Sequence, residues 1–87
     1  MITNERELVG EIVRNSITEF GGSYLGYSGI APNGTSYIEA TDFLFRLPDG
    51  KRGSINVSGR DVQRNPGSLL DQLVQSRVEN AVKQTSA

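Results

Sequence analysis

The sequence predicts a single α+β domain over residues 1–87 with the element order α-β-β-β-α. In this fold class, a three-stranded antiparallel meander packs with an N-terminal and a C-terminal helix. Apolar side chains recur at helical spacing near both ends of the chain, in residues 5–20 and 67–83. Between them the periodicity shifts towards two, and the turns Pro32-Asn33-Gly34 and Pro48-Asp49-Gly50 interrupt the apolar runs.

The first predicted helix covers residues 5–20. Asn4 is a favourable N-cap residue, and Glu7 three positions later completes a capping box. The apolar side chains that follow at helical spacing are Leu8, Val9, Ile12, Val13, Ile17 and Phe20. Gly21-Gly22 then provides the residue type that ends helices in the left-handed conformation. We expect the helix to end near Phe20.

Three strands are predicted over residues 23–31, 36–47 and 52–58. The first is the weakest, because Gly26 and Gly29 interrupt it. The second is rich in tyrosine, threonine and phenylalanine, residue types that favour strands. Its apolar residues also match helical spacing, so a helix is the alternative for this segment.

The turn between the second and third strands is the best-defined local feature. In Leu47-Pro48-Asp49-Gly50, proline is at the second position and glycine at the fourth, as a type I turn with a following bulge prefers. The strand after the turn alternates cleanly, with Ile55 and Val57 on one face. An antiparallel hairpin is therefore expected here.

The C-terminal helix is predicted over residues 67–83. Either Ser68 with Asp71, or Asn65 with Pro66, provides the start signal. Its apolar side chains are Leu69, Leu70, Leu73, Val74, Val78, Ala81 and Val82. In both helices the apolar stripe is wider than the roughly 100° that packing on one side requires. This excess apolar surface indicates a further contact.

The second strand carries apolar residues on both of its faces. One face holds Tyr37, Phe43, Phe45 and Leu47. The other holds the candidate interface residues Ile38, Ala40 and Leu44. Two helices can cover one face of the sheet, so the second face indicates a homodimer or an interface with another protein. The alternative is a bent strand enclosed within one domain.

The composition excludes several kinds of chemistry. The chain of 87 residues has no cysteine and no histidine, so it can form neither a disulfide nor a Ser-His or Cys-His catalytic pair. A zinc site is disfavoured for the same reason. We therefore predict a domain with no catalytic residues, no metal and no cofactor. Small domains that lack such cross-links are often stabilised by self-association.

The expected location is the cytoplasm. Residues 1–5 are polar and acidic, where a signal peptide needs a basic and then an apolar stretch. No apolar run approaches the roughly 20 residues that span a bilayer. We accordingly expect no membrane partner.

Basic residues are concentrated in one part of the chain, although the net charge is only −1. The segment 46–64 has five basic residues against two acidic ones: Arg46, Lys51, Arg52, Arg60 and Arg64. They are candidate ligands for phosphate, with Tyr24 and Tyr27 as candidate stacking partners for a base. The alternative is that Lys51 and Arg52 keep the hairpin soluble, while Arg60 and Arg64 pair with acids of the first helix.

These features lead to two hypotheses about function. The first is a non-catalytic protein-binding or regulatory domain, a homodimer that modulates or inhibits a larger macromolecular partner, as small phage-type inhibitors do. Its surface would be the second sheet face or the hairpin tip. The alternative is binding of nucleic acid or a phosphate ligand by the segment 46–64, which requires its basic residues to converge. The pI of about 5.3 counts against nucleic acid.

Overall fold

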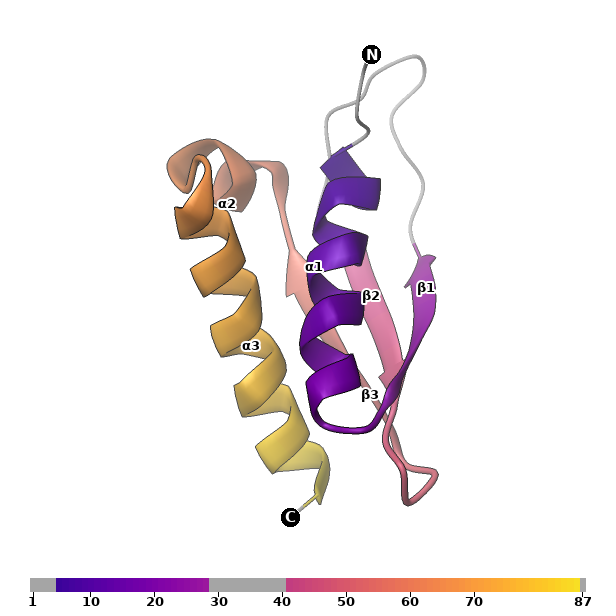
Figure 1. Ribbon diagram of the computed structural model, residues 1–87. Coiled ribbons are helices and arrows are strands. Elements are labelled where there is room, and N and C mark those ends of the chain that lie inside the picture. Colours follow the sequence, from indigo (N-terminus) through magenta and orange to yellow (C-terminus); the bar gives the residue numbers. More distant parts are fainter. Residues whose placement is uncertain (1–4, 29–40, 87) are drawn as a thin grey trace.

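The computed structural model describes residues 5–28 and 41–86 and confirms the predicted α+β fold (Figure 1). A helix is followed by three antiparallel strands, and two helices complete the chain. The elements are α1 (Glu5–Glu19), β1 (Ser23–Ser28), β2 (Thr41–Arg46), β3 (Arg52–Val57), α2 (Gly59–Arg64) and α3 (Ser68–Ser86).

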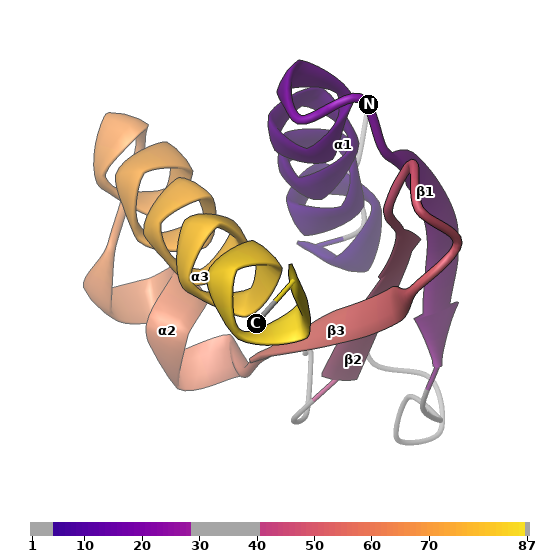
Figure 2. The same ribbon diagram turned by 90° about the horizontal axis from the view of Figure 1, so that it is seen from below.

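The fold has two layers, because both long helices pack on the same face of the sheet. The strand order is β1-β2-β3, so each strand pairs with its neighbour in the sequence. Figure 2 shows α1 and α3 on one side of this sheet, and none of the described helices lies on the other side. The burial of side chains alternates along β2, as expected for a sheet covered on one face. Phe43 and Phe45 are fully buried, while Asp42, Leu44 and Arg46 are exposed.

The core lies between the two layers and takes apolar side chains from each long element. The two phenylalanines of β2 are at its centre, and both are completely inaccessible to solvent. The other buried apolar residues are Val9, Ile12, Val13, Ile17, Leu47, Ile55, Val57, Leu70, Val74 and Val78. The predicted stripes of both helices therefore supply the core, but Leu8, Phe20 and Leu69 remain exposed at their edges.

The ends of α1 and of the β2–β3 hairpin follow the turn chemistry of the sequence. The amide groups of Gly21 and Gly22 donate to the carbonyl oxygens of Thr18 and Ile17, at 2.9 and 3.0 Å. With φ of 78° at Gly21, these two bonds form the Schellman motif that ends α1. In the hairpin, the Gly50 amide donates to the Leu47 carbonyl oxygen at 2.9 Å, and φ of Gly50 is 91°. This is the predicted tight turn followed by a bulge.

Strand β2 starts at Thr41 in the described part of the chain, so the predicted strand over 36–47 is present in its second half. Leu47 lies beyond the strand, because it already belongs to the hairpin turn. The turn Pro32-Asn33-Gly34, residues 29–31 of the first predicted strand and residues 36–40 of the second lie outside the described residues, as does the Asn4 cap.

Helix α2 is not among the elements predicted from the sequence, because residues 59–64 lie between the predicted third strand and the predicted C-terminal helix. Its start is a capping box: the Asp61 amide donates to Ser58 Oγ at 3.3 Å, and the Ser58 amide donates to Asp61 Oδ2 at 2.9 Å. The sequence contains this signal as a serine followed three positions later by an aspartate. No apolar stripe follows this signal, so hydrophobic periodicity alone does not predict a helix here.

Arg77 of α3 forms hydrogen bonds to both α2 and β3. Arg77 Nη1 donates to Asp61 Oδ2 at 2.8 Å and to the Asn56 carbonyl oxygen at 2.7 Å, and Nη2 donates to Asp61 Oδ1 at 3.2 Å. The hydrogen bond from Arg77 is the main reason that the pKa of Asp61 falls to about 2, and the bond from the Ser58 amide lowers it further. Residues of α2, α3 and β3 thus meet at the guanidinium group of Arg77.

We expect Asp61→Asn to destabilise the protein by about 1–2 kcal/mol at pH 7, because a charge-assisted pair and a helix cap are both weakened. The pKa of Asp61 in the folded protein is below its ordinary value. As the pH falls, the unfolded state therefore binds more protons than the folded state does. The stabilisation is therefore complete above about pH 4, and wild type loses it towards pH 2. Denaturant unfolding at pH 7, 4 and 2 measures the difference.

The matched control is Glu79→Gln, which changes an exposed acid of α3 that forms no ion pair with the described residues. It should leave the free energy of unfolding within about 0.5 kcal/mol of wild type. Equal stability of Asp61→Asn and wild type at pH 7 would show that Arg77 does not hold these elements together.

Candidate functional site

The uncovered face of the sheet is the first candidate surface, and it has a small apolar centre. The register shifts between Tyr24 and Gly26, so β1 has one extra residue opposite Leu44. This bulge places Leu25 beside Leu44 on the uncovered face, where the two side chains are 46% and 36% exposed. Leu44 is thus on the face that the sequence predicted for it, whereas Ile38 and Ala40 lie outside the described residues.

Opposite charges lie at the two ends of this face. Arg46 and Arg52 are direct cross-strand partners, and both are exposed. Like charges in this relation repel each other, and within the described residues neither forms an ion pair. At the other end, Asn56 Nδ2 donates to Asp42 Oδ1 at 2.9 Å. The face therefore runs from a basic end, past two leucines, to an acidic end.

The structure divides the predicted basic segment into two groups. Arg46, Lys51 and Arg52 lie together where the β2–β3 hairpin turns. Arg60 and Arg64 lie on α2, which follows the opposite end of β3 (Figure 1). All five side chains are exposed. Arg60 and Arg64 form no ion pair with the described acids of α1 or of any other described element.

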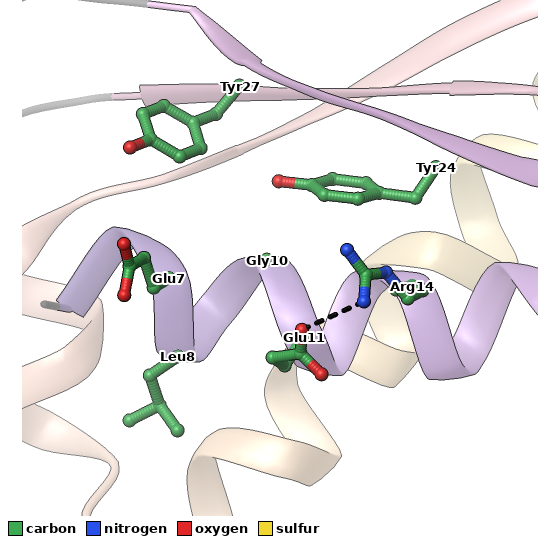
Figure 3. Close-up of a pocket in the computed structure, with 7 residues that line it drawn as sticks. All are labelled: Glu7, Leu8, Gly10, Glu11, Arg14, Tyr24 and Tyr27. Atoms are coloured by element: carbon green, nitrogen blue, oxygen red, sulfur yellow. Dashed lines mark ion pairs between the residues drawn. The ribbon is translucent and has the colours of Figure 1, made fainter. Parts of the chain in front are cut away.

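Tyr24 and Tyr27 belong to a different part of the molecule. Both pair with phenylalanines of β2 and face the helix layer. They line a groove of about 420 Å³ between β1 and α1, which we call the tyrosine groove (Figure 3). The described residues that line it are Glu7, Leu8, Gly10, Glu11, Arg14, Tyr24 and Tyr27. The sheet separates these tyrosines from Arg46 and Arg52, so the predicted combination of stacking rings with basic residues is not assembled.

The tyrosine groove combines aromatic rings with charged side chains. The guanidinium carbon of Arg14 is 5.8 Å from the centre of the Tyr24 ring, and Arg14 Nη1 is 3.1 Å from Glu11 Oε1. The Tyr27 ring is tilted by 55° against Phe43 at 5.9 Å, which anchors it to the core. Burial is the main reason that the pKa of Tyr24 is raised, with a further contribution from Tyr27.

Gly10 allows the Tyr24 ring to lie close to α1. A Cβ atom at this position would be 2.6 Å from the Tyr24 hydroxyl oxygen. Sequence analysis missed this residue, and with it the groove. The available signal is a glycine in the middle of the predicted first helix, since such a glycine costs helix stability and often marks a close approach.

The described residues contain neither a metal-binding cluster nor a membrane-spanning helix. No group of three or more acidic side chains is placed to hold a metal ion within residues 5–28 and 41–86. None of the described helices has the length and apolarity that crossing a bilayer requires.

We expect Gly10→Ala to leave the fold intact, because alanine favours the helix by up to about 1 kcal/mol and the clashing atom is the end of a side chain. The Tyr24 hydroxyl group must move away from α1 into the groove. Its burial then decreases, and the pKa of Tyr24 should fall towards the ordinary value. Ultraviolet titration of the phenols measures this shift, with Tyr24→Phe to assign the signal. An unchanged Tyr24 pKa in a folded Gly10→Ala variant would contradict the close approach.

No protein-family model, no curated protein and no solved structure matches this chain. The uncovered sheet face and the tyrosine groove are the two most distinctive surfaces of the described residues.

Proposed function

We propose that this chain is a non-catalytic protein-binding domain that acts as a homodimer through its uncovered sheet face. The observation that supports this is the order of charges on the face, which is complementary to itself. The basic end carries Arg46 and Arg52, the acidic end carries Asp42, and Leu25 and Leu44 lie between them.

A two-fold axis through the middle of the face brings opposite charges together. Asp42 and Arg46 are each two residues from Leu44, so they lie at equal distances on either side of it along β2. When a second copy is rotated about an axis across the strands at Leu44, Arg46 of each copy faces Asp42 of the other. Such an interface is isologous, with the same contacts made twice. The strands of the two sheets are then aligned, as in a β-sandwich.

The same arrangement offsets two unfavourable features of the single chain, which are the exposed leucine side chains and the repulsion between two arginines. Leu44 of one copy covers Leu44 of the other, and the two Leu25 side chains meet in the same way, so their apolar surface leaves water. The carboxylates of the second copy offset the repulsion between Arg46 and Arg52. Because most of the face is polar and only three strands wide, we expect a dimer that dissociates on dilution.

Nucleic-acid binding is the less well supported alternative. It needs the basic residues to converge, whereas Arg60 and Arg64 lie on α2, away from the hairpin. It also needs Tyr24 or Tyr27 beside them, and both rings face the helix layer. A regulatory role towards a larger partner remains a prediction, and the dimer would present two copies of any surface that such a partner binds.

A charge exchange tests the dimer. Asp42→Arg alone, and the double variant Arg46→Asp with Arg52→Asp, should each be monomeric, because each places like charges at both ends of the interface. An equimolar mixture of the two variants restores both contacts and should form a heterodimer. Sedimentation velocity over a range of concentrations measures the masses.

Lys51→Asp is the matched control, since it reverses a charge at the hairpin tip, beyond the last paired residues of the face. It should dimerise like wild type. A wild-type chain that stays monomeric at its highest soluble concentration, or a mixture that does not associate, would rule out the proposed interface. Salt-sensitive binding of mixed oligonucleotides that Arg46→Asp abolishes would favour the alternative.

A further inference from the structure

We propose that the outer edge of β3 binds an extended segment of a protein partner, which adds to the sheet as a fourth strand. The inference rests on the proposed protein-binding function, but it does not rest on the dimer. The strand order β1-β2-β3 leaves one edge of β3 without a neighbouring strand among the described elements. The proposed dimer interface is a face of the sheet, so this edge stays available to a partner.

The hydrogen-bond pattern of the β2–β3 hairpin determines which backbone groups of β3 point outward. The Leu47 amide donates to the Lys51 carbonyl oxygen at 2.8 Å, so these two residues are a hydrogen-bonded pair. Such pairs alternate with non-hydrogen-bonded pairs along an antiparallel ladder. Continuing along the register, the residues of β3 whose amide and carbonyl groups point away from β2 are Arg52, Ser54 and Asn56.

A side chain of α3 shows the same direction at one of these residues. Arg77 Nη1 donates to the Asn56 carbonyl oxygen at 2.7 Å, so that oxygen lies on the outer side of β3. The Asn56 amide and both backbone groups of Ser54 have no hydrogen-bond partner among the described residues. Both residues are exposed at the surface. A row of unpaired amide and carbonyl groups at strand spacing is a template for another strand.

A groove of about 220 Å³ lies beside this edge, between residues 54–56 of β3 and one side of α3. The α3 residues that line it are Arg77, Asn80, Ala81 and Gln84. Their spacing of three and four residues places them along the same side of the helix. Figure 2 shows α3 beside β3, on the helix side of the sheet. The edge of β3 therefore offers backbone groups for pairing, and the groove offers space for side chains of the added strand.

The groove favours short, β-branched side chains. In an antiparallel pair, the side chains of directly opposite residues lie on the same face of the sheet. The partner residue opposite Ile55 therefore faces the helix layer and enters the groove, where Ile55 and Ala81 provide apolar contacts. The partner residue opposite Ser54 faces the uncovered side. We expect a partner segment with valine or threonine at alternate positions, because both fit a strand and a small space.

Hydrogen exchange in the free protein tests whether the edge is open. The amides of Gly53, Ile55 and Val57 bond to β2 and should exchange slowly. The amides of Ser54 and Asn56 should exchange at least about tenfold faster, because they lack a partner. Slow exchange at Ser54 without any ligand would show that the edge is already paired, by this chain or by a second copy, and would overturn the inference.

The binding test uses the peptide acetyl-Gln-Val-Gln-Val-Gln-amide and the full-length protein. When its third residue is opposite Ser54, both valines face the groove. A shift by one residue would turn the glutamines into the groove, so the alternation fixes which face each side chain takes. We expect the peptide to shift the amide resonances of Ser54 and Asn56 downfield and to slow their exchange by at least about fivefold. The resonances of β1 should change much less.

Methylated peptides provide the matched control, because only every second amide of an added strand donates to β3. Methyl groups on the amide nitrogens of the third and fifth residues, which face β3, should abolish binding. Methyl groups on the amide nitrogens of the two valines, which face away from β3, should leave most of it. The two methylated peptides have the same composition, so a difference between them reports the strand pairing itself.

A variant of the protein removes the same hydrogen bond from the other side. Ser54→Pro lacks the outward amide but keeps the bonds between β3 and β2, since proline is tolerated at a strand edge. It should weaken peptide binding by at least about tenfold. Ser54→Thr keeps the amide and should bind the peptide like wild type. Thermal unfolding shows whether each variant is folded, and the methylated peptides decide the question if Ser54→Pro is not.

The inference is overturned if the two methylated peptides bind equally well, or if the unmethylated peptide does not shift the amides of Ser54 and Asn56 up to its solubility limit. Sedimentation of the same samples separates the two proposals. Peptide binding by a chain that stays monomeric would refute the dimer alone. A dimer that does not bind the peptide would refute the edge site alone.

Discussion

The burial of Phe43 and Phe45 on one face of β2 is the interaction on which the rest of the structure depends. As the central strand, β2 presents these rings to the helix layer, and the apolar stripes of α1 and α3 close over them. Truncating a buried phenylalanine costs about 3–5 kcal/mol in typical cores. That is comparable to the whole stability of many small domains. Both long helices therefore pack on this face of the sheet.

The packing of both helices on one face of the sheet determines which surfaces remain for function. Two helices suffice to cover the phenylalanine face, and the described part of the chain has no further element to place over Leu25, Leu44 and their charged neighbours. The tyrosine groove arises from the same arrangement, because α1 lies beside edge strand β1 and Gly10 lets Tyr24 approach it. Both surfaces are thus consequences of covering a three-stranded sheet on one side only.

The sequence predicted what depends on local chemistry and periodicity. The Schellman end of α1 at Gly21, the hairpin turn at Gly50 and the outward position of Leu44 are all consequences of residue type or alternation. It did not predict what depends on distance in three dimensions. Arg52 and Arg60 are close in sequence, but β3 carries the chain from one end of the domain to the other between them. The groove was missed because Gly10 and Tyr24 meet only after α1 packs on β1.

The order of the elements also sets the sequence of events during synthesis. Strands β1, β2 and β3 are neighbours in the chain, so their pairing closes short loops and can begin early. The C-terminal α3 packs against both α1 and β3, and the buried side chains of Ile55 and Val57 share a core with it. While the ribosome still covers α3, that side of the core stays open to water. A nascent chain therefore completes this core only after α3 has emerged from the ribosome.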